Sequence, residues 1–156
     1  MRWGEFLFGF RGRVNRAKYW LFLLVSVIAV TVAITLTATM WIQGIAGGAV
    51  GWSMLAVILA GIIYLGVTVA GIAVGIKRLH DRDKSGWWLL VFYLAPSLLS
   101  GAAPWLGSDG VGIIFSLSAY AISMWAFVEL GCLRGTVGAN KYGPDPVSDT
   151  VRITPA

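Results

Sequence analysis

Charged residues are scarce in this sequence of 156 residues, at 12% against the roughly 25% that is usual in soluble proteins. Residues 19–76 include no Asp, Glu, Lys, Arg or His, and residues 85–128 include one charged residue, Asp109. Hydrophobic residues make up 58% of the chain. One water-soluble domain of this length could not bury so much apolar surface, so lipid must be the solvent for much of the chain.

Cysteine and histidine each occur once, as Cys132 and His80. A single cysteine excludes an internal disulfide and a cysteine-cluster metal site. A metal site built on His80 and its neighbour Asp81 would need further histidines or carboxylates, and the sequence has no second histidine. We therefore expect no metal and no cofactor, and a structural or lipid-contacting role for His80.

The net charge of +5 raises the question of nucleic-acid binding. No basic helix or exposed aromatic strand accompanies this charge, so the sequence argues against a nucleic-acid partner. All twelve Lys and Arg residues lie in an N-terminal leader, a hinge at residues 77–88 or a C-terminal tail. Basic residues flank membrane spans on the cytoplasmic side. The pattern predicts a multi-pass membrane protein whose two termini and hinge face the cytoplasm.

Four apolar runs are long enough to cross about 30 Å of hydrocarbon as helices. Before them, Trp3, Phe6, Leu7 and Phe10 recur at i, i+3, i+4 and i+7, which places them on one face of a short helix. That helix is expected to lie in the membrane interface. We predict an all-α integral membrane protein with one domain over residues 1–146 and a flexible tail at 147–156. The predicted spans are residues 19–42, 53–76, 87–103 and 111–133.

Polar and aromatic residues mark the ends of these spans. Asn15 is a suitable N-cap for a helix that begins at Arg16, and Ser85 for the third span. Pro96 is expected to kink the third span. A glycine-rich turn at residues 43–51 is predicted between the first two spans. We expect Trp20, Trp87 and Trp88 to lie at the membrane interface, in the aromatic belt between headgroups and tails.

The hinge reads KRLHDRDKSGWW from Lys77 to Trp88 and is densely charged. On a continuing helix, Lys77 and Asp81 would attract each other at i, i+4, and Arg78 and Arg82 would repel. Asp81 could also reach Arg78. Exposed pairs are worth at most about 1 kcal/mol. We therefore expect a solvated loop whose cations meet anionic headgroups, each contributing about 1 kcal/mol.

Glu129 is an ionisable residue near the end of the fourth span, and such residues are functional candidates inside a membrane. It precedes Arg134 by five positions, close enough to the interface to snorkel or to pair with a basic residue. We favour a structural ion pair and keep a proton-relay role as the alternative.

The segment after the last span, residues 134–146, reads RGTVGANKYGPDP. Its glycines permit backbone angles that other residues resist, and its prolines fix an extended or turned path. We expect so constrained a segment to dock on the hinge and on residues 11–16, where Asp145 would find cations.

Three pieces of the sequence together resemble a known family. They are GRVNRAKYW at residues 12–20, KRLHDRDKSGWW at 77–88 and GTVGANKYGPDP at 135–146. They resemble the small bacterial inner-membrane proteins grouped as domain of unknown function number 805, over nearly the whole chain. The resemblance implies a four-helix inner-membrane protein with cytoplasmic termini, and it brings no activity, substrate or catalytic residue. The residues to which we assign an organising role are Asn15, Asp81, Ser85, Gly86, Asn140, Tyr142 and Asp145.

The leading functional hypothesis is a non-enzymatic protein whose basic cytoplasmic face binds anionic lipid headgroups or a membrane-protein partner, with homo-oligomers also open. The alternative is a small transporter or channel subunit that uses Glu129 and the Pro96 region. A third is an enzyme that acts on lipid or a phosphorylated substrate through His80, Asp81 and Asp83. The residues predicted to contact lipid or a partner are Arg13, Arg16, Arg78, Arg82, His80, Trp20, Trp87 and Trp88.

Overall fold

The computed structural model describes residues 3–47, 50–107 and 110–147, and the regular elements within these ranges are helices. Four helical stretches are long and apolar enough to cross a membrane, which confirms the predicted all-α, four-span fold. Of the predicted flexible segment 147–156, only Val147 lies within the described residues. The elements are α1 (Trp3–Phe8), α2 (Arg16–Gly47), α3 (Val50–Asp81), α4 (Trp88–Ala102), η1 (Ala103–Leu106), α5 (Gly110–Phe127) and η2 (Val128–Cys132).

The helices differ from the predicted spans at their ends. α2 and α3 extend through most of the glycine-rich stretch 43–51, ending at Gly47 and beginning again at Val50. Glycine in a helix costs about 1 kcal/mol relative to alanine, whereas backbone groups without partners in lipid cost several kcal/mol each. The helical conformation therefore persists. α3 also continues through Asp81, so residues 77–81 of the predicted hinge are helical.

Of the two predicted helix caps, one is present in full and the other in part. The Oδ1 atom of Asn15 accepts a hydrogen bond from the backbone N–H of Lys18 at 2.9 Å, which caps α2 as predicted. α4 begins at Trp88 without a side-chain cap. The carbonyl of Ser85 accepts from the N–H of Trp88 at 3.2 Å, so backbone groups close this first turn. The Oγ atom of Ser85 accepts a long hydrogen bond from the N–H of Trp87 at 3.4 Å, so the cap predicted at Ser85 is present in part, just before the first residue of α4.

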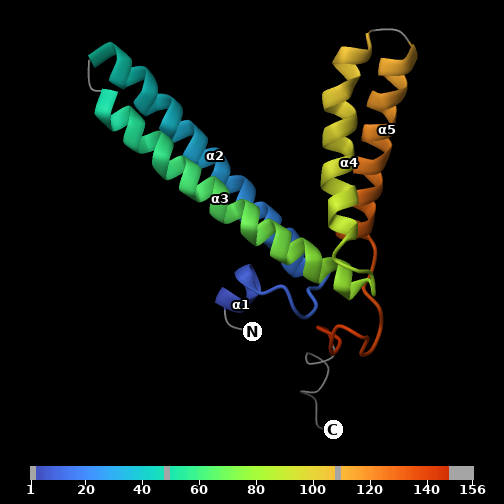
Figure 1. Cartoon of the computed structure of the whole chain (residues 1–156). Coiled ribbons are helices and arrows are strands. Elements are labelled where there is room, and N and C mark those ends of the chain that lie inside the picture. Colours follow the sequence, from blue (N-terminus) through green and yellow to red (C-terminus); the bar gives the residue numbers. More distant parts are fainter. Residues whose placement is uncertain (1–2, 48–49, 108–109, 148–156) are drawn as a thin grey trace.

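The membrane-spanning helices form two hairpins that diverge as a V (Figure 1). α2 packs along α3, and α4 packs along α5. The hairpins meet where α1 and the segment after η2 also lie. We call this region the polar end and define it as residues 9–16, 77–88 and 129–147. Every ion pair among the described residues lies within it.

Two glycines bring the hairpins together at the polar end. A Cβ atom added to Gly75 of α3 would lie 2.8 Å from Cδ1 of Leu89 in α4. A Cβ on Gly86 would lie 2.9 Å from Cγ2 of Ile76, which explains the organising role expected of Gly86. The buried core is therefore concentrated where the hairpins meet, and it consists of Val14, Tyr19, Val74, Leu79, Leu89, Phe92 and Leu130.

α1 is shorter than the predicted interfacial helix and ends before Phe10. It lies against α3. Phe6 packs against the core, whereas Trp3 is 75% exposed. The apolar face of α1 is thus divided between the protein core and the surroundings.

We expect Gly75→Val to destabilise the junction of the hairpins, because a branched side chain there would displace Leu89. Overpacking of this kind costs about 1–3 kcal/mol. Gly61→Val is the matched control, since it makes the same change on α3 at a position where a Cβ atom has nothing within 4 Å. The thermal unfolding midpoint in detergent should fall for Gly75→Val alone. Equal midpoints for the two variants would contradict this packing.

Candidate functional site at the polar end

Asp81, in the last turn of α3, is the centre of a buried charge cluster. Its Oδ1 atom accepts from Nε of Arg13 at 3.1 Å, and its Oδ2 atom accepts from Nη1 of Arg78 at 2.6 Å. The three residues are at most 5% exposed. The predicted solvated loop is therefore wrong for Arg78 and Asp81, because the fold supplies enough partners to hold their charges inside the protein.

Lys77 does not form the predicted pair with Asp81. Its ammonium group donates to the carbonyl of Glu5 at 3.0 Å and to that of Phe6, and it lies 5.3 Å from the centre of the Phe6 ring. Asp81 instead pairs with Arg78, whose planar guanidinium can bond to a carboxylate and to carbonyls at the same time. Lys77 thus fastens α1 to α3.

Arg78 also binds the carboxyl end of η2. Its Nε atom donates to the carbonyl of Leu130 at 2.7 Å, and its Nη2 atom donates to that of Leu133. The last carbonyls of a helix lack partners within the helix, and a cation there complements the helix dipole. The indole N–H of Trp20 donates to the next carbonyl, that of Gly131, at 2.9 Å. The π-helical turn η2 is thereby joined to both α2 and α3.

Arg13 connects the leader to the C-terminal tail. Its guanidinium donates to the carbonyls of Thr136 at 2.5 Å and Gly138 at 2.6 Å. The N–H of Thr136 donates to the carbonyl of Asp81 at 2.8 Å. Gly135 comes so close that a Cβ atom on it would lie 2.0 Å from Oδ2 of Asp81. The tail is therefore docked on the leader and the hinge, as the sequence predicts.

His80 and Tyr142 stack face to face, with ring centres 3.8 Å apart. Nδ1 of His80 lies 3.3 Å from the carbonyl oxygen of Gly12, and the His80 carbonyl accepts from Nδ2 of Asn140 at 2.9 Å. Oδ1 of Asn140 accepts from the N–H of Tyr142 at 2.9 Å. These contacts hold the leader, α3 and the tail together.

Glu129 is buried in η2, where its Oε1 atom lies 3.2 Å from Nε of Arg82 and 3.1 Å from Nζ of Lys84. The favoured structural ion pair is therefore present, and its cations come from the hinge. Glu129 does not line the groove beside Pro96. The structure thus does not bring together the two parts of the predicted transport path.

The residues predicted to contact lipid headgroups fall into two groups. Arg13 and Arg78 are buried and saturated by Asp81 and backbone carbonyls, so the prediction of headgroup contacts for these two is wrong. Arg82 is half-buried beside Glu129, and His80 is half-buried beneath Tyr142. The predicted residues that the fold leaves exposed are Arg16, Trp20, Trp87 and Trp88.

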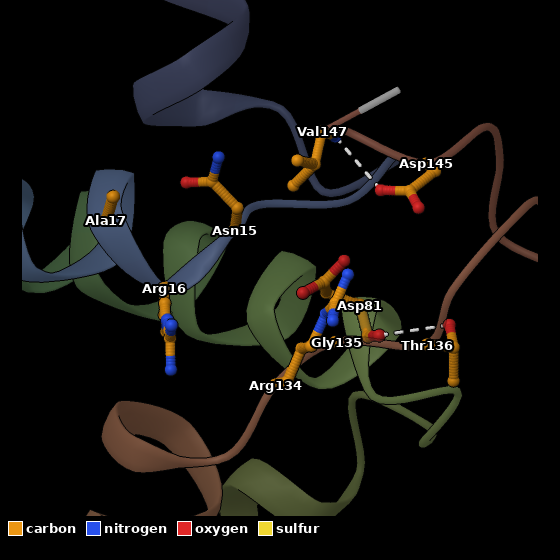
Figure 2. Close-up of a pocket in the computed structure, with 9 residues that line it drawn as sticks. All are labelled: Asn15, Arg16, Ala17, Asp81, Arg134, Gly135, Thr136, Asp145 and Val147. Carbon is orange, nitrogen blue, oxygen red and sulfur yellow. Dashed lines mark hydrogen bonds between the residues drawn. The ribbon is translucent and has the colours of Figure 1, made fainter. Parts of the chain in front are cut away.

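An open pocket of about 320 Å³ lies between the start of α2 and the tail (Figure 2). Arg16, at the first turn of α2, and Arg134, just after η2, both line it and are both exposed. Across residues 3–47, 50–107 and 110–147, neither guanidinium group has a hydrogen bond or an ion pair. Asp81 forms part of the wall, but Arg13 and Arg78 already neutralise its charge.

Arg134 and Thr136 were not among the predicted site residues. The signal for Arg134 was its position as the first basic residue after the last span, a usual place for a headgroup contact. Nothing in the sequence indicated that the backbone of Thr136 would bind both Arg13 and Asp81.

Asp145 lines the same pocket from the tail. Its carboxylate accepts from the backbone N–H groups of Val147 at 2.9 Å and Gly138 at 3.0 Å. These N–H groups, together with the charges of Arg13 and Arg134, hold the pKa of the Asp145 carboxyl below its usual value. Asp145 is thus an anion at neutral pH that fixes the turn of the tail.

We expect Asp81→Asn to destabilise the protein by about 3–5 kcal/mol, because it leaves two buried guanidinium groups without their carboxylate. Asp83→Asn is the control: its carboxylate is 47% exposed and lies 3.7 Å from Lys141. That change should cost no more than about 1 kcal/mol. Chemical unfolding in detergent, followed by tryptophan fluorescence, measures both. A loss at Asp81 no larger than the loss at Asp83 would contradict the buried cluster.

The tail should loosen in acid. A carboxyl whose pKa is depressed by folding contributes stability above its unfolded pKa, and this contribution is lost as the pH falls through the folded pKa. Amide exchange of residues 136–147, corrected for intrinsic rates, should therefore speed up between about pH 5 and about pH 2. Asp145→Asn should exchange quickly at both values. An acid response that persists in this variant would assign the effect to another group.

Comparison with known proteins places the chain among bacterial inner-membrane proteins. It is 30% identical to the inner membrane protein YhaH of Escherichia coli over 146 residues, which cover 88% of this chain and 87% of YhaH. It is 30% identical to the inner membrane protein YhaI over 138 residues, covering 88% and 86%, and 28% identical to the uncharacterized protein YiiR over 143 residues, covering 90% and 88%. No solved structure matches the chain.

These similarities agree with the four apolar helices and with a charged region formed by three separated motifs. The family model described as "Protein of unknown function (DUF805)" matches residues 7–144, from α1 to the docked tail. The chain is therefore an inner-membrane protein that belongs to the DUF805 family.

Proposed function

We propose that the pocket lined by Arg16 and Arg134 binds the phosphate of an anionic lipid headgroup. The observation that carries this proposal is that two exposed guanidinium groups, without partners in the described chain, line one pocket. Guanidinium groups match phosphate oxygens in geometry as well as charge. Two of them in one pocket would favour an anionic lipid over a neutral one.

The position of Arg16 along α2 supports a lipid as the source of the phosphate. Trp20 follows Arg16 by one helical turn, which is about 6 Å along the axis. It is 43% exposed, and exposed tryptophans of membrane proteins gather at the level of the headgroups. Arg16 would thus lie at or just outside the plane of the lipid phosphates.

The buried charge cluster supports the proposal by fixing the pocket walls. Asp81, Arg13 and Arg78 are fully bonded, and through Thr136 and Leu130 they hold the two segments that flank Arg134. A pocket that is already ordered loses little conformational freedom when a ligand binds.

In this proposal, the polar end faces the cytoplasm and binds lipid. The basic residues of the leader, hinge and tail favour the cytoplasmic side for this end of the molecule. The role is binding without catalysis, since the ring of His80 is stacked on Tyr142 and the carboxylate of Asp81 is saturated by arginines.

The test compares two double variants with the same change in net charge. Arg16→Gln/Arg134→Gln removes the pocket guanidiniums, and Arg11→Gln/Lys18→Gln removes two exposed cations that do not line the pocket. Native mass spectrometry after gentle extraction, at low and raised salt, measures retained phosphatidylglycerol against phosphatidylethanolamine. If each pocket guanidinium contributes about 1 kcal/mol to lipid binding, the pocket variant should retain about thirtyfold less phosphatidylglycerol.

The control variant should keep the preference of the wild type for phosphatidylglycerol. Equal losses in the two variants would mean that the preference comes from overall charge, and the proposed pocket would be rejected. A wild-type protein without any anionic preference at low salt would reject it as well.

A further inference from the structure

A second cavity lies where the two hairpins meet, on the side of the hydrocarbon. It is a groove of about 350 Å³ lined by residues of α2, α4, α5 and η2. Most of its wall is apolar, but it includes the side chains of two tyrosines, Tyr19 from α2 and Tyr93 from α4. Tyr19 belongs to the buried core, so its ring is held in place.

The hydroxyl groups of these tyrosines have no hydrogen bonds within the part of the chain that the structure describes. The two serines of the groove differ, because each is satisfied by its own helix. Ser97 Oγ donates to the carbonyl of Tyr93 at 2.7 Å, and Ser123 Oγ donates to that of Ala119 at 2.9 Å. A hydroxyl that faces lipid without a partner is costly, so the two tyrosines call for an acceptor from outside the chain.

The groove is aligned with the phosphate pocket. Arg16 lines the pocket and Tyr19 lines the groove, and residues three apart lie on the same side of a helix. On the facing side, Leu130 of η2 lines the groove, and Arg134, which follows η2, lines the pocket. Along α2, Tyr19 of the groove is therefore about 4.5 Å deeper in the membrane than Arg16 of the pocket.

This separation matches the chemistry of a phospholipid. The headgroup and interfacial layer is about 5–7 Å thick on each side of the hydrocarbon, and the ester carbonyls lie at its inner edge. Ester carbonyls are strong acceptors. A helix of a second copy would offer few acceptors, because its backbone carbonyls are bonded internally.

We infer that the groove holds the ester carbonyls and upper acyl chains of one diacyl phospholipid, with Tyr19 and Tyr93 donating to the ester oxygens. The inference rests on the proposed function, since the phosphate of the same lipid occupies the pocket of Arg16 and Arg134. It assigns the site a whole lipid as ligand, held at both its headgroup and its glycerol ester region.

The test uses the full chain and phosphatidylglycerol labelled with carbon-13 at the ester carbonyls. Tyr19→Phe/Tyr93→Phe removes the two hydroxyls and keeps the rings. Tyr64→Phe/Tyr120→Phe is the control, because these tyrosines also lie on membrane-spanning helices and are exposed, as Tyr93 is, but they do not line the groove. Thermal unfolding midpoints verify that both variants are folded.

Two readouts are expected to agree. Infrared spectra of the wild type and the control should contain a down-shifted ester band from hydrogen-bonded carbonyls, and the groove variant should lack it. The loss of two hydrogen bonds should reduce retention of the labelled lipid roughly tenfold in the groove variant. An unchanged ester band and unchanged retention in that variant would overturn the inference, as would an equal loss in the control.

A soluble headgroup separates this inference from the proposed function. Glycerol 3-phosphate binding, followed by calorimetry, should be weakened by Arg16→Gln/Arg134→Gln and unaffected by Tyr19→Phe/Tyr93→Phe. If only the arginine variant differs from wild type in every assay, the proposed function holds and the ester site is rejected. If the arginine variant retains anionic lipid normally, the proposed function fails. In that case, the infrared ester band of labelled phosphatidylethanolamine, compared between the wild type and Tyr19→Phe/Tyr93→Phe, tests the groove independently of the pocket.

Discussion

Asp81 holds its charge inside the protein because Arg13 and Arg78 both bond to its carboxylate. A buried carboxylate with only one cation would leave oxygen lone pairs or a second guanidinium unpaired, and such groups cost several kcal/mol. The same arginines use their remaining N–H groups on carbonyls of η2 and of the tail. Four separated parts of the chain therefore depend on one carboxylate for their arrangement.

The V of the two hairpins follows from this concentration of contacts (Figure 1). Between helices in lipid there is no hydrophobic driving force, so close association needs small residues or hydrogen bonds. Both are found together where the hairpins meet, in Gly75 against Leu89 and in Trp20 bonded to Gly131. Farther along, the hairpins diverge, and the groove lined by Tyr19 and Tyr93 lies between α2 and the hairpin of α4 and α5 (Figure 1).

The sequence was sufficient to predict the class, the four spans and the docked tail, because each depends on local pattern. Apolar length decides the spans, and Asn15 before Arg16 decides the start of α2. Burial of Lys77, Arg78 and Asp81 could not be predicted in this way. Whether a charge enters the core depends on acceptors distant in sequence, here the carbonyls of Glu5, Leu130 and Thr136.

A charged motif in a membrane protein is therefore ambiguous until its partners are known. The hinge is the most charged part of this chain, yet Lys77, Arg78 and Asp81 bind the chain itself. The fold uses these charges, whereas the two arginines that line the pocket, Arg16 and Arg134, have no side-chain hydrogen bond or ion pair among the residues that the structure describes. A ligand can only be recognised by groups that the fold does not already satisfy. For that reason, Arg16 at the start of α2 and Arg134 after η2 are better candidates for ligand binding than the densely charged hinge.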